Sequence, residues 1–255
     1  MNGQFKFDGK IALVTGASGG LGRHFAQVLA AAGAGVCVAA RRMDKVTETV
    51  AGIESSGGRA FGVEMDVTDS ESVDAAFGVI EEQAGPVTVV VNNAGIASGA
   101  LALDLEESDW DQVMDTNLKG AWTVAQAAAK RMAELETGGV IVNIASVLGF
   151  GVSKGVLPYA VSKAGLIQMT KALALEWARH GIRVNALAPG YVETDLTREY
   201  LATEDGQKLL KRIPQRRPAE MAELDGPLLL LASDASSYMT GSVITVDGGH
   251  LVSSL

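Results

Sequence analysis

Tyr159 and Lys163 lie four residues apart in the stretch Pro-Tyr-Ala-Val-Ser-Lys that begins at Pro158. Pro158 favours the first turn of a helix, and residues four apart share one helix face. A tyrosine with an ordinary pKa of about 10 exchanges protons poorly near neutrality, but a neighbouring ammonium stabilises the phenolate and lowers that pKa. The pair therefore predicts a proton donor and acceptor for a reaction between a carbonyl and an alcohol.

A glycine-rich turn at 15–22 follows a short apolar run and precedes a helix-forming segment that starts near Arg23. Glycines allow backbone N–H groups and the positive end of the helix dipole to approach a phosphate. The spacing Gly16-x3-Gly20-x-Gly22 departs from the Gly-x-Gly-x2-Gly of the common dinucleotide fingerprint. Taken alone, the turn indicates either a pyrophosphate site or an ordinary tight connection between strand and helix.

Both features need elements that hold them in place, and the chain alternates short β-branched, apolar runs with longer amphipathic segments. The apolar runs predict strands at 11–15, 36–40, 60–63, 87–91, 140–144, 183–187 and 243–246. The amphipathic segments predict helices at 20–33, 43–56, 70–84, 108–134, 158–180 and 219–232. Strands that are apolar on both faces are typical of a parallel sheet covered by helices on each side.

We therefore expect an α/β protein with a Rossmann-type, doubly wound fold: a seven-stranded parallel sheet with helices on both faces and ligands at the carboxyl ends of its strands. Without a linker or a shift in composition, one domain covering 1–255 is the simplest organisation. The segment 191–218 is polar, charged and long for a connection, so we expect it to cover a substrate.

Further motifs follow successive strands. The turn reads Thr-Gly-x3-Gly-x-Gly from Thr15, Asp66-Val67 follows the third strand, Asn92-Asn93-Ala94-Gly95 follows the fourth, and Pro189-Gly190 closes the sixth, with Thr194 four residues later. Each motif alone also suits a turn or a helix cap, because Asn, Asp and Gly dominate both settings. Together, with their order and spacing, they resemble the short-chain dehydrogenase/reductase family over residues 10–249.

The resemblance implies a catalytic set of Asn117, Ser146, Tyr159 and Lys163. Ser146 matches the family's serine, which hydrogen-bonds the substrate carbonyl oxygen, and Lys163 also holds the nicotinamide ribose. Asn117 matches the asparagine that helps hold a water in a proton relay through Lys163. Outside this family, Ser146 would be an N-cap or turn residue, and Asn117 a solvated polar residue or a helix irregularity.

The resemblance also implies that a dinucleotide lies along the carboxyl ends of the strands. Its predicted contacts are Gly16, Ser18, Gly20, Leu21, Gly22, Arg41, Arg42, Asp66, Val67, Asn93, Ala94, Gly95, Tyr159, Lys163, Pro189, Gly190, Val192 and Thr194. No metal site is expected, because the three histidines, His24, His180 and His250, lack the spacing of metal ligands.

The second expected strand ends in Ala40, Arg41 and Arg42. NAD-preferring relatives carry at this strand end an acidic residue that binds the ribose hydroxyls and repels a 2′-phosphate. With Ala40 there and Arg41 next, the chain resembles NADP-preferring members, in which an arginine pairs with the phosphate. The prediction is NADP(H) as the preferred cofactor, with NAD(H) as the alternative. The other interpretation is a solvated arginine pair, since Ser18 and Gly19 lack the basic residue of many NADP-preferring turns.

The leading functional hypothesis is hydride transfer between NADP(H) and a ketone or secondary alcohol. A 3-oxoacyl thioester reductase and an NAD-linked polyol or sugar dehydrogenase remain open within the family, and a non-catalytic dinucleotide sensor remains open outside it. Substrate identity is expected to depend on 191–218 and on the segment after Asn92.

A net charge of −9 opposes binding to nucleic acid or to anionic membranes, so a small molecule is the expected partner. The single cysteine, Cys37, and the lack of an apolar stretch in the first ten residues predict a cytoplasmic protein. The resemblance implies a homotetramer, or a homodimer, that pairs segments 108–134 and 158–180. A stripe of Leu166, Met169, Leu173 and Trp177 suits either that interface or the core.

Overall fold

A parallel β-sheet forms the centre of the molecule in the computed structural model, which describes residues 5–253 apart from the side chains of residues 195 and 196. Within the described residues the sheet has seven strands in the order β3-β2-β1-β4-β5-β6-β7. They are β1 (Ile11–Thr15), β2 (Gly35–Ala40), β3 (Arg59–Glu64), β4 (Val87–Asn92), β5 (Gly139–Ile144), β6 (Ile182–Pro189) and β7 (Val243–Val246). The order reverses between β1 and β4, which opens a crevice at the carboxyl ends of these two strands. The predicted fold class is confirmed.

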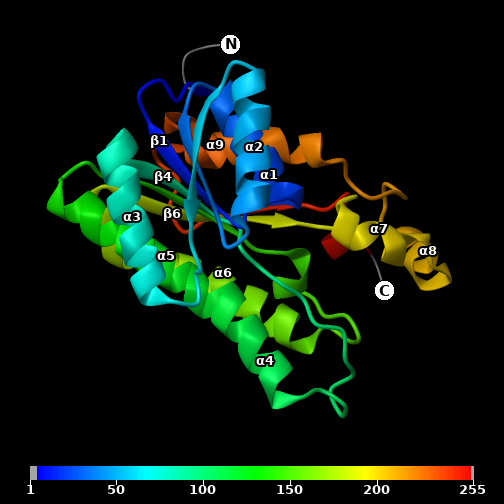
Figure 1. The fold of residues 1–255 in the computed structure, drawn as a ribbon. Coiled ribbons are helices and arrows are strands. Elements are labelled where there is room, and N and C mark those ends of the chain that lie inside the picture. The colour runs from blue at the N-terminus through cyan, green and yellow to red at the C-terminus, as the bar shows by residue number, and fades with distance from the viewer. Residues whose placement is uncertain (1–4, 254–255) are drawn as a thin grey trace.

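Helices cover both faces of this sheet. They are α1 (Gly20–Ala31), α2 (Met43–Ser55), α3 (Ser70–Ala84), α4 (Glu107–Met114), α5 (Gly120–Glu134), α6 (Leu157–Trp177), α7 (Asp195–Ala202), α8 (Glu204–Leu210) and α9 (Asp225–Ala232). Helices α1, α2 and α9 lie on one face and α3, α5 and α6 on the other (Figure 1). The two layers agree with the doubly wound arrangement expected for alternating strands and helices.

Alternate strand residues supply the two core layers. Val14 and Val38 pack on the side of α1 and α9, whereas Leu13 and Cys37 pack on the side of α3 and α5. Because both faces are buried, β1 and β2 are apolar throughout instead of alternating with polar residues. Burial also raises the pKa of the Cys37 thiol, so this cysteine is an inert part of the core.

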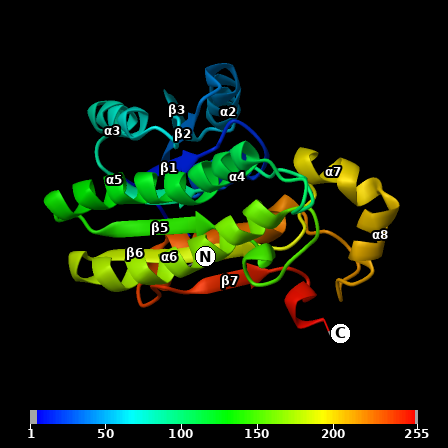
Figure 2. The same cartoon turned by 90° about the horizontal axis from the view of Figure 1, so that it is seen from below.

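Two predicted helices differ from the structure. The helix expected at 108–134 is interrupted by a π-helical turn at Asp115–Lys119. The sequence does not reveal this turn, because one extra residue in a single turn hardly disturbs the apolar periodicity of a helix. The helix expected at 219–232 begins only at Asp225, after a 3-10 turn at Met221–Leu224. The polar segment 191–218 contains α7 and α8, which project beyond the carboxyl end of the sheet (Figure 2).

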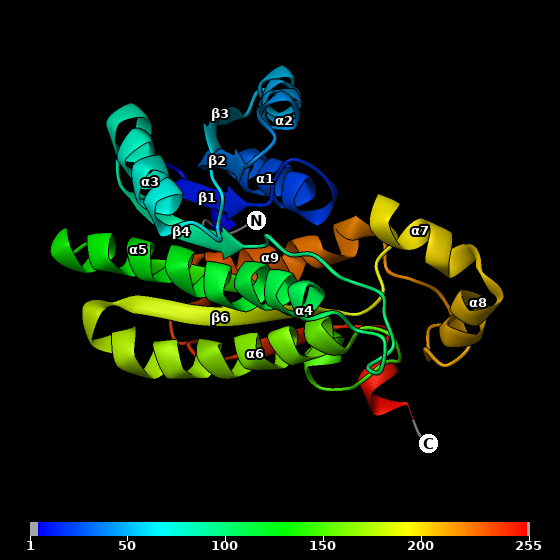
Figure 3. The same ribbon diagram turned by 60° about the horizontal axis from the view of Figure 1, so that its bottom comes forward.

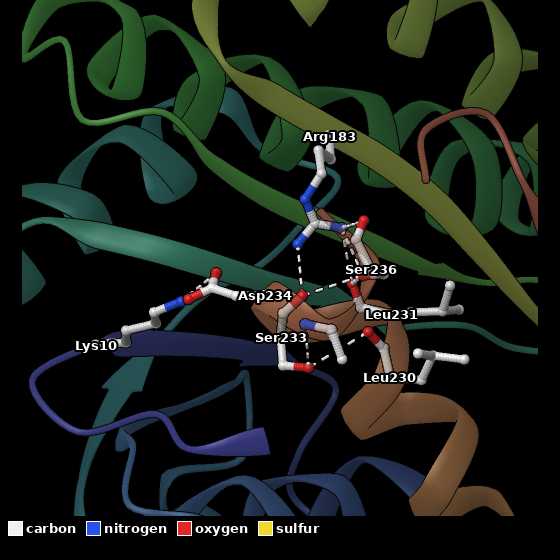
Figure 4. Close-up of polar contacts among 8 residues, drawn as sticks. Lys10, Arg183, Leu230, Leu231, Ser233, Asp234 and Ser236 are labelled. Atoms are coloured by element: carbon white, nitrogen blue, oxygen red, sulfur yellow. Dashed lines mark hydrogen bonds and ion pairs between the residues drawn. The ribbon is translucent and has the colours of Figure 1, made fainter. Parts of the chain in front are cut away.

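Arg183 lies at the amino end of β6 and anchors it to the segment at the end of α9. Its guanidinium donates to the carbonyl oxygens of Leu231 at 3.2 Å, Ser233 at 2.9 Å and Ser236 at 3.0 Å (Figure 4). These carbonyls lie in the last turn of α9 and in the 3-10 turn that follows it, where helix C=O groups lack intrahelical N–H partners. Arg183 therefore fixes α9 against the sheet. Nearby, Lys10 and Asp234 form an exposed ion pair at 2.8 Å.

The apolar stripe on α6 is mainly core. Leu166 is 1% exposed and Leu173 is 8% exposed, and Met169 and Trp177 pack partly against the buried layer. The core interpretation is therefore correct for Leu166 and Leu173. Within residues 5–253, no helix is both long and apolar enough to cross a bilayer.

Candidate active site

The glycine-rich turn lies at the reversal of strand order, between the ends of β1 and β4. Gly16 has a φ of +64°, and a Cβ on it would lie 2.8 Å from Ala94 Cα. A Cβ on Gly22 would lie 2.5 Å from Asn93 Nδ2 and would also collide with the carbonyl oxygen of Gly16. Both glycines are therefore required by the backbone packing of the turn itself.

The first turn of α1 presents an open anion site. No side chain among the described residues caps this helix, and its first turn carries no acidic residue. A Cβ on Gly19 or Gly20 would meet nothing within 4 Å, so the space in front of the helix is clear. The free N–H groups and positive dipole end of α1 thus fit a pyrophosphate, as the sequence predicts.

Thr15 joins this turn to the segment after β4, a role that the sequence motif alone did not suggest. Its hydroxyl oxygen accepts from the backbone N–H groups of Asn93 and Ala94, both at 3.1 Å. In return, the Asn93 amide donates to the carbonyl oxygens of Thr15 at 3.0 Å and Gly16 at 3.3 Å. The side chain of Asn93 is therefore engaged in holding the turn, and its cofactor contact stays a prediction.

The arginines after β2 have different partners. Arg42 donates to Ser18 Oγ at 3.2 Å, which brings its guanidinium beside the turn. Arg41 is more exposed and lies 3.7 Å from the Asp66 carboxylate. Partial burial raises the pKa of Asp66, but hydrogen bonds from Thr68 and the charge of Arg41 outweigh it and hold the pKa below its ordinary value. A cationic and an anionic side chain therefore meet just beyond the ends of β2 and β3. The sequence predicts that an adenosine ribose binds at this place.

Arg23 and Thr49 hold the glycine-rich turn against α2, a role that was not identified from the sequence. Arg23 donates to the Ser18 carbonyl oxygen at 3.1 Å and to the Thr49 hydroxyl at 3.0 Å. Thr49 in turn donates to the Ala17 carbonyl oxygen at 3.2 Å. Only the folded chain brings these residues together, because they come from the turn, α1 and α2.

Tyr159 and Lys163 occupy the first two turns of α6, as the sequence predicts, with Pro158 near its start. Lys163 Nζ donates to the carbonyl oxygen of Ile144 at 2.7 Å and lies 5.5 Å from the centroid of the Tyr159 ring. Burial disfavours the ammonium form and lowers the pKa of Lys163 to about 8. At pH 7 the side chain is still mostly protonated.

Ser146 follows the end of β5 and is the polar neighbour of the Tyr159 phenol. Burial raises the pKa of Tyr159, and the Ser146 hydroxyl offsets only part of that rise. The expectation of a net lowered pKa is thus not met in the structure, because desolvation of the phenol dominates. Ser146 also accepts from the backbone N–H of Leu148 at 3.2 Å, which fixes its position as the N-cap of a short 3-10 turn.

Asn117 lies in the π-helical turn and is almost fully buried. Its side chain accepts from the N–H of Ile96 and donates to the carbonyl oxygen of the same residue, both at 2.8 Å, and donates to Ser162 Oγ at 3.2 Å. A Cβ on Gly95 would lie 3.4 Å from Asn117 Oδ1 and 3.7 Å from Lys163 Nζ. The side chains of Asn117 and Lys163 thus flank a small space that glycine leaves open.

The Pro189-Gly190 motif lies at the carboxyl end of β6, where Gly190 donates to the carbonyl oxygen of Val246 at 2.8 Å. Val192 is buried and pairs with Ala219, and Thr194 is the N-cap of α7. Val67 lies beyond β3, packed close to the backbone at Gly120. The fold therefore brings all predicted groups to one edge of the sheet, with α7 and α8 beside it.

Tyr191 is the first residue of the segment 191–218 that the sequence predicts to cover a substrate, and it contacts several other segments. Its ring centroid lies 6.3 Å from that of Tyr200 on α7 and 5.9 Å from that of His250 near the C-terminus. Burial and the neighbouring Tyr200 raise its pKa, whereas a hydrogen bond with Ser153 opposes the rise. A polar cavity of about 170 Å³ beside Tyr191 is lined by Gln215, Arg217, Glu223 and Asp247.

Other titratable groups lie away from this edge. His24 on α1 contacts Asp225 on α9 at 2.6 Å, which satisfies the histidine as expected for a structural residue. In the described part of the chain, no three His, Cys, Asp or Glu side chains are grouped to hold a metal ion. A shallow apolar groove of about 430 Å³ runs between the π-helical turn and α6, and includes Trp122 and Met169.

Comparison with known proteins gives the same assignment. A family model described as Enoyl-(Acyl carrier protein) reductase matches residues 16–250. The chain is 39% identical to gluconate 5-dehydrogenase of Gluconobacter oxydans over 98% of this chain and 97% of that one. It is 40% identical to 3-oxoacyl-(acyl-carrier-protein) reductase of Aquifex aeolicus, covering 96% and 99%. Among solved structures, gluconate 5-dehydrogenase of Burkholderia cenocepacia in complex with NADP and tartrate is 37% identical, with a TM-score of 0.94 over 99% and 98%.

Identities near 40% over almost the whole length, together with the same fold, confirm the resemblance seen in the motifs. The chain belongs to the short-chain dehydrogenase/reductase family and is an NAD(P)-dependent oxidoreductase of CH–OH groups.

Proposed function

We propose that this protein is an NADP(H)-dependent ketone reductase, and in reverse a secondary-alcohol dehydrogenase, with Tyr159 as the proton donor and acceptor. One observation carries the proposal: the Tyr159 ring lies 5.5 Å from the buried ammonium of Lys163, and the buried Ser146 is the polar neighbour of the Tyr159 phenol. A donor, an acid and a cation thus converge where a carbonyl oxygen gains negative charge. A non-catalytic sensor has no need of this arrangement.

When bound, the nicotinamide supplies or accepts the hydride at the carbonyl carbon. In reduction, Ser146 donates a hydrogen bond to the carbonyl oxygen and Tyr159 transfers its phenolic proton to that oxygen. The raised pKa of Tyr159 keeps the phenol protonated at neutral pH, which is the form that reduction requires. Lys163 stabilises the phenolate that remains, and oxidation of an alcohol follows the same steps in reverse.

Proton return to Tyr159 passes through Lys163 in this proposal. The ammonium is held by the Ile144 carbonyl oxygen, and the space beside Gly95 separates it from Asn117 Oδ1. That space is bordered by a donor and an acceptor, so it suits a water that relays protons. Asn117 acts as a positioning residue, because its amide also fixes both backbone groups of Ile96.

The open N-terminus of α1 is proposed to hold the cofactor pyrophosphate, and Arg41 and Arg42 the 2′-phosphate of NADP. The position of Arg42 beside Ser18 supports this preference, because it brings a cation to a turn that lacks one in its own sequence. Arg41 exchanges its contact with Asp66 for the phosphate, while Asp66 and Val67 lie against the adenine.

Replacement of Tyr159 by Phe tests the proposal. We expect kcat for ketone reduction to fall by at least about 10³-fold, since the variant lacks the only acid at the reacting oxygen. The dissociation constant for NADPH, measured by fluorescence titration, is expected to stay within about threefold of the wild-type value. Residual turnover above about 10% of wild type would refute the role of Tyr159.

A second candidate is a dehydrogenase of a sugar acid, as two of the named relatives are. The cavity beside Tyr191 favours it, because the Gln215 amide in its lining suits the hydroxyl groups of a sugar. NADPH oxidation with 5-keto-D-gluconate, compared with simple ketones, separates the two candidates.

We also propose a homotetramer, with a homodimer as the alternative, and a cytoplasmic location. Exposed apolar side chains near α5 and α6, such as Trp122 at 41%, support assembly through these helices. The single reduced cysteine, Cys37, supports the location. Light scattering of the purified protein measures the assembly directly.

A further inference from the structure

Three segments that are distant in the sequence lie beyond the carboxyl ends of the strands, close to Ser146 and Tyr159. They are the β4–α4 connection at 93–106, the β5–α6 connection at 145–156 and the C-terminal turn His250–Val252, which approach one another in Figure 3. Ala100 of the first pairs with Val156 of the second. A Cβ on Gly151 would lie 3.8 Å from Leu251 Cδ2, which joins the second segment to the third.

Exposed apolar side chains gather on these segments. Phe150 is 51% exposed and Val152 is 92% exposed, and they flank Gly151, the residue beside Leu251. Leu251 is 39% exposed, and Leu101, next to Ala100, is 57% exposed. We call Leu101, Phe150, Val152 and Leu251 the apolar rim. An exposed apolar surface of this kind next to a few polar groups is typical of a ligand-binding site.

Charged partners for an acidic substrate are scarce around the rim. The sequence 93–106 contains no Arg or Lys, and 145–156 contains only Lys154. Arg217, in the cavity beside Tyr191, forms two hydrogen bonds with Glu223 at 2.6 and 2.7 Å. This pairing lowers the pKa of Glu223 to about 2, so the glutamate stays charged and neutralises the arginine at working pH. A carboxylate moved out of water here would meet little compensation.

On the basis of the proposed ketone reductase function, we propose that the non-reacting part of the substrate is an uncharged apolar group, an alkyl or aryl chain, bound by the apolar rim. The carbonyl lies at Ser146 and Tyr159, and the chain extends over Phe150, Val152 and Leu251. This assignment separates the protein from relatives whose names specify a sugar acid. Each methylene buried on the rim raises kcat/KM by about fourfold.

The test compares kcat/KM for the linear ketones 2-butanone to 2-octanone, for 5-keto-D-gluconate and for 2,3-butanedione, with saturating NADPH and the full-length protein. The small diketone reports on the chemistry alone, because it has no chain to reach the rim. We expect kcat/KM to rise by about fourfold per added methylene. We expect kcat/KM for 5-keto-D-gluconate to be at least about 100-fold lower than for 2-octanone. The reason is that the polar groups of the sugar acid would be buried at the rim without hydrogen-bond partners.

A pair of variants assigns the effect to the rim. In Phe150→Gln, the increase in kcat/KM per added methylene is expected to fall below about twofold. For 2,3-butanedione, kcat/KM of this variant should stay within about twofold of the wild-type value. Leu135→Gln is the matched control, because Leu135 is 55% exposed, close to the 51% of Phe150, and follows α5 at the far end of the molecule. The Leu135→Gln variant should keep the wild-type increase in kcat/KM per added methylene.

Three outcomes overturn the inference. Equal kcat/KM along the ketone series, or a preference for the sugar acid, contradicts the apolar substrate but leaves the proposed oxidoreductase chemistry standing. If Phe150→Gln changes the molar mass in light scattering and leaves the rise per methylene unchanged, the rim is a contact between copies of this chain. If no ketone and no diketone is reduced while NADPH binds, both this inference and the proposed function fail.

Discussion

Lys163 donates from its buried ammonium to the carbonyl oxygen of Ile144, the last residue of β5, at 2.7 Å. This bond ties the helix that carries Tyr159 to the strand end that precedes Ser146. The ammonium is desolvated there, and its pKa falls to about 8. The residue proposed to tune the proton donor is therefore itself close to titration.

The pH dependence of reduction follows from this pKa. Above a pH of about 8 Lys163 loses its proton, and the positive charge that stabilises the Tyr159 phenolate is lost. We expect kcat/KM for NADPH, which reports on the free enzyme, to fall about tenfold per pH unit above this point. A Lys163→Arg variant that retains turnover should hold its activity to higher pH. A wild-type profile that is flat to pH 10 would contradict the assignment.

The same burial makes Lys163 costly for stability. The fall of its pKa from 10.5 to about 8 corresponds to roughly 3 kcal/mol that favours the unfolded state at neutral pH. Because the unfolded chain binds more protons between these two pKa values, this cost is full below pH 8 and disappears as the pH approaches 10.5. Lys163→Met should therefore abolish turnover yet raise the Tm at pH 7 by roughly 4–8 °C, after allowing for the lost hydrogen bond.

Thermal unfolding at pH 7 and pH 10 tests whether Lys163→Met raises the Tm as expected. The gain from Lys163→Met should shrink at pH 10, where the wild-type lysine is neutral in the folded protein. A lower Tm for the variant at pH 7 would show that the hydrogen bond to Ile144 outweighs the burial of charge.

Cofactor preference should depend on both arginines after β2. Arg41→Ala and Arg42→Ala are each expected to weaken NADPH binding by about 10- to 100-fold, because each loses a charge-assisted contact with the 2′-phosphate. NADH binding should stay within about twofold, and Ala40→Asp combined with Arg41→Ala should reverse the preference. Fluorescence titration with both cofactors measures this. Arg179→Ala, whose arginine contacts His180 beyond α6, is the control. Equal kcat/KM of the wild type with NADH would refute the preference.

The anchor at the start of β6 should be important for stability but not for chemistry. Arg183→Met removes three charge-assisted hydrogen bonds to backbone carbonyl oxygens at the end of α9, and we expect a loss of about 3 kcal/mol in the free energy of unfolding. Lys10→Ala, which removes only the exposed pair with Asp234, should cost less than about 1 kcal/mol. Urea titrations of the two variants give the comparison. Similar losses would show that Arg183 is no more than a surface contact.

Most of the fold was predictable because the central strands are largely apolar on both faces and the motifs follow successive strands. The expected strand at 36–40, for example, differs from β2 only by the inclusion of Gly35. The π-helical turn was not predictable, because Asn117 differs from an ordinary helix residue only in its buried contacts with Ile96. A sequence shows that such a residue is present but not which distant backbone it will meet.

The candidate site was predicted in position but not in electrostatics. The sequence places Lys163 one turn from Tyr159, which suggests that the ammonium lowers the pKa of the phenol. In the structure the same packing that brings them together removes water from both, and burial dominates both pKa values. Likewise, no motif indicates that Arg42 reaches Ser18, because that contact depends on how α2 leaves the sheet.

The glycines of the first turn have a consequence for how this protein can change. Gly16 and Gly22 are closely surrounded, so neither accepts even an alanine without movement of the turn after β1 or of the segment after β4. Gly19 is different: its backbone is extended, with φ at 178°, and a side chain there would enter open space. Cofactor selectivity can thus be retuned by evolution or by engineering through position 19 and the arginines opposite it, while the backbone framework that binds the pyrophosphate stays the same.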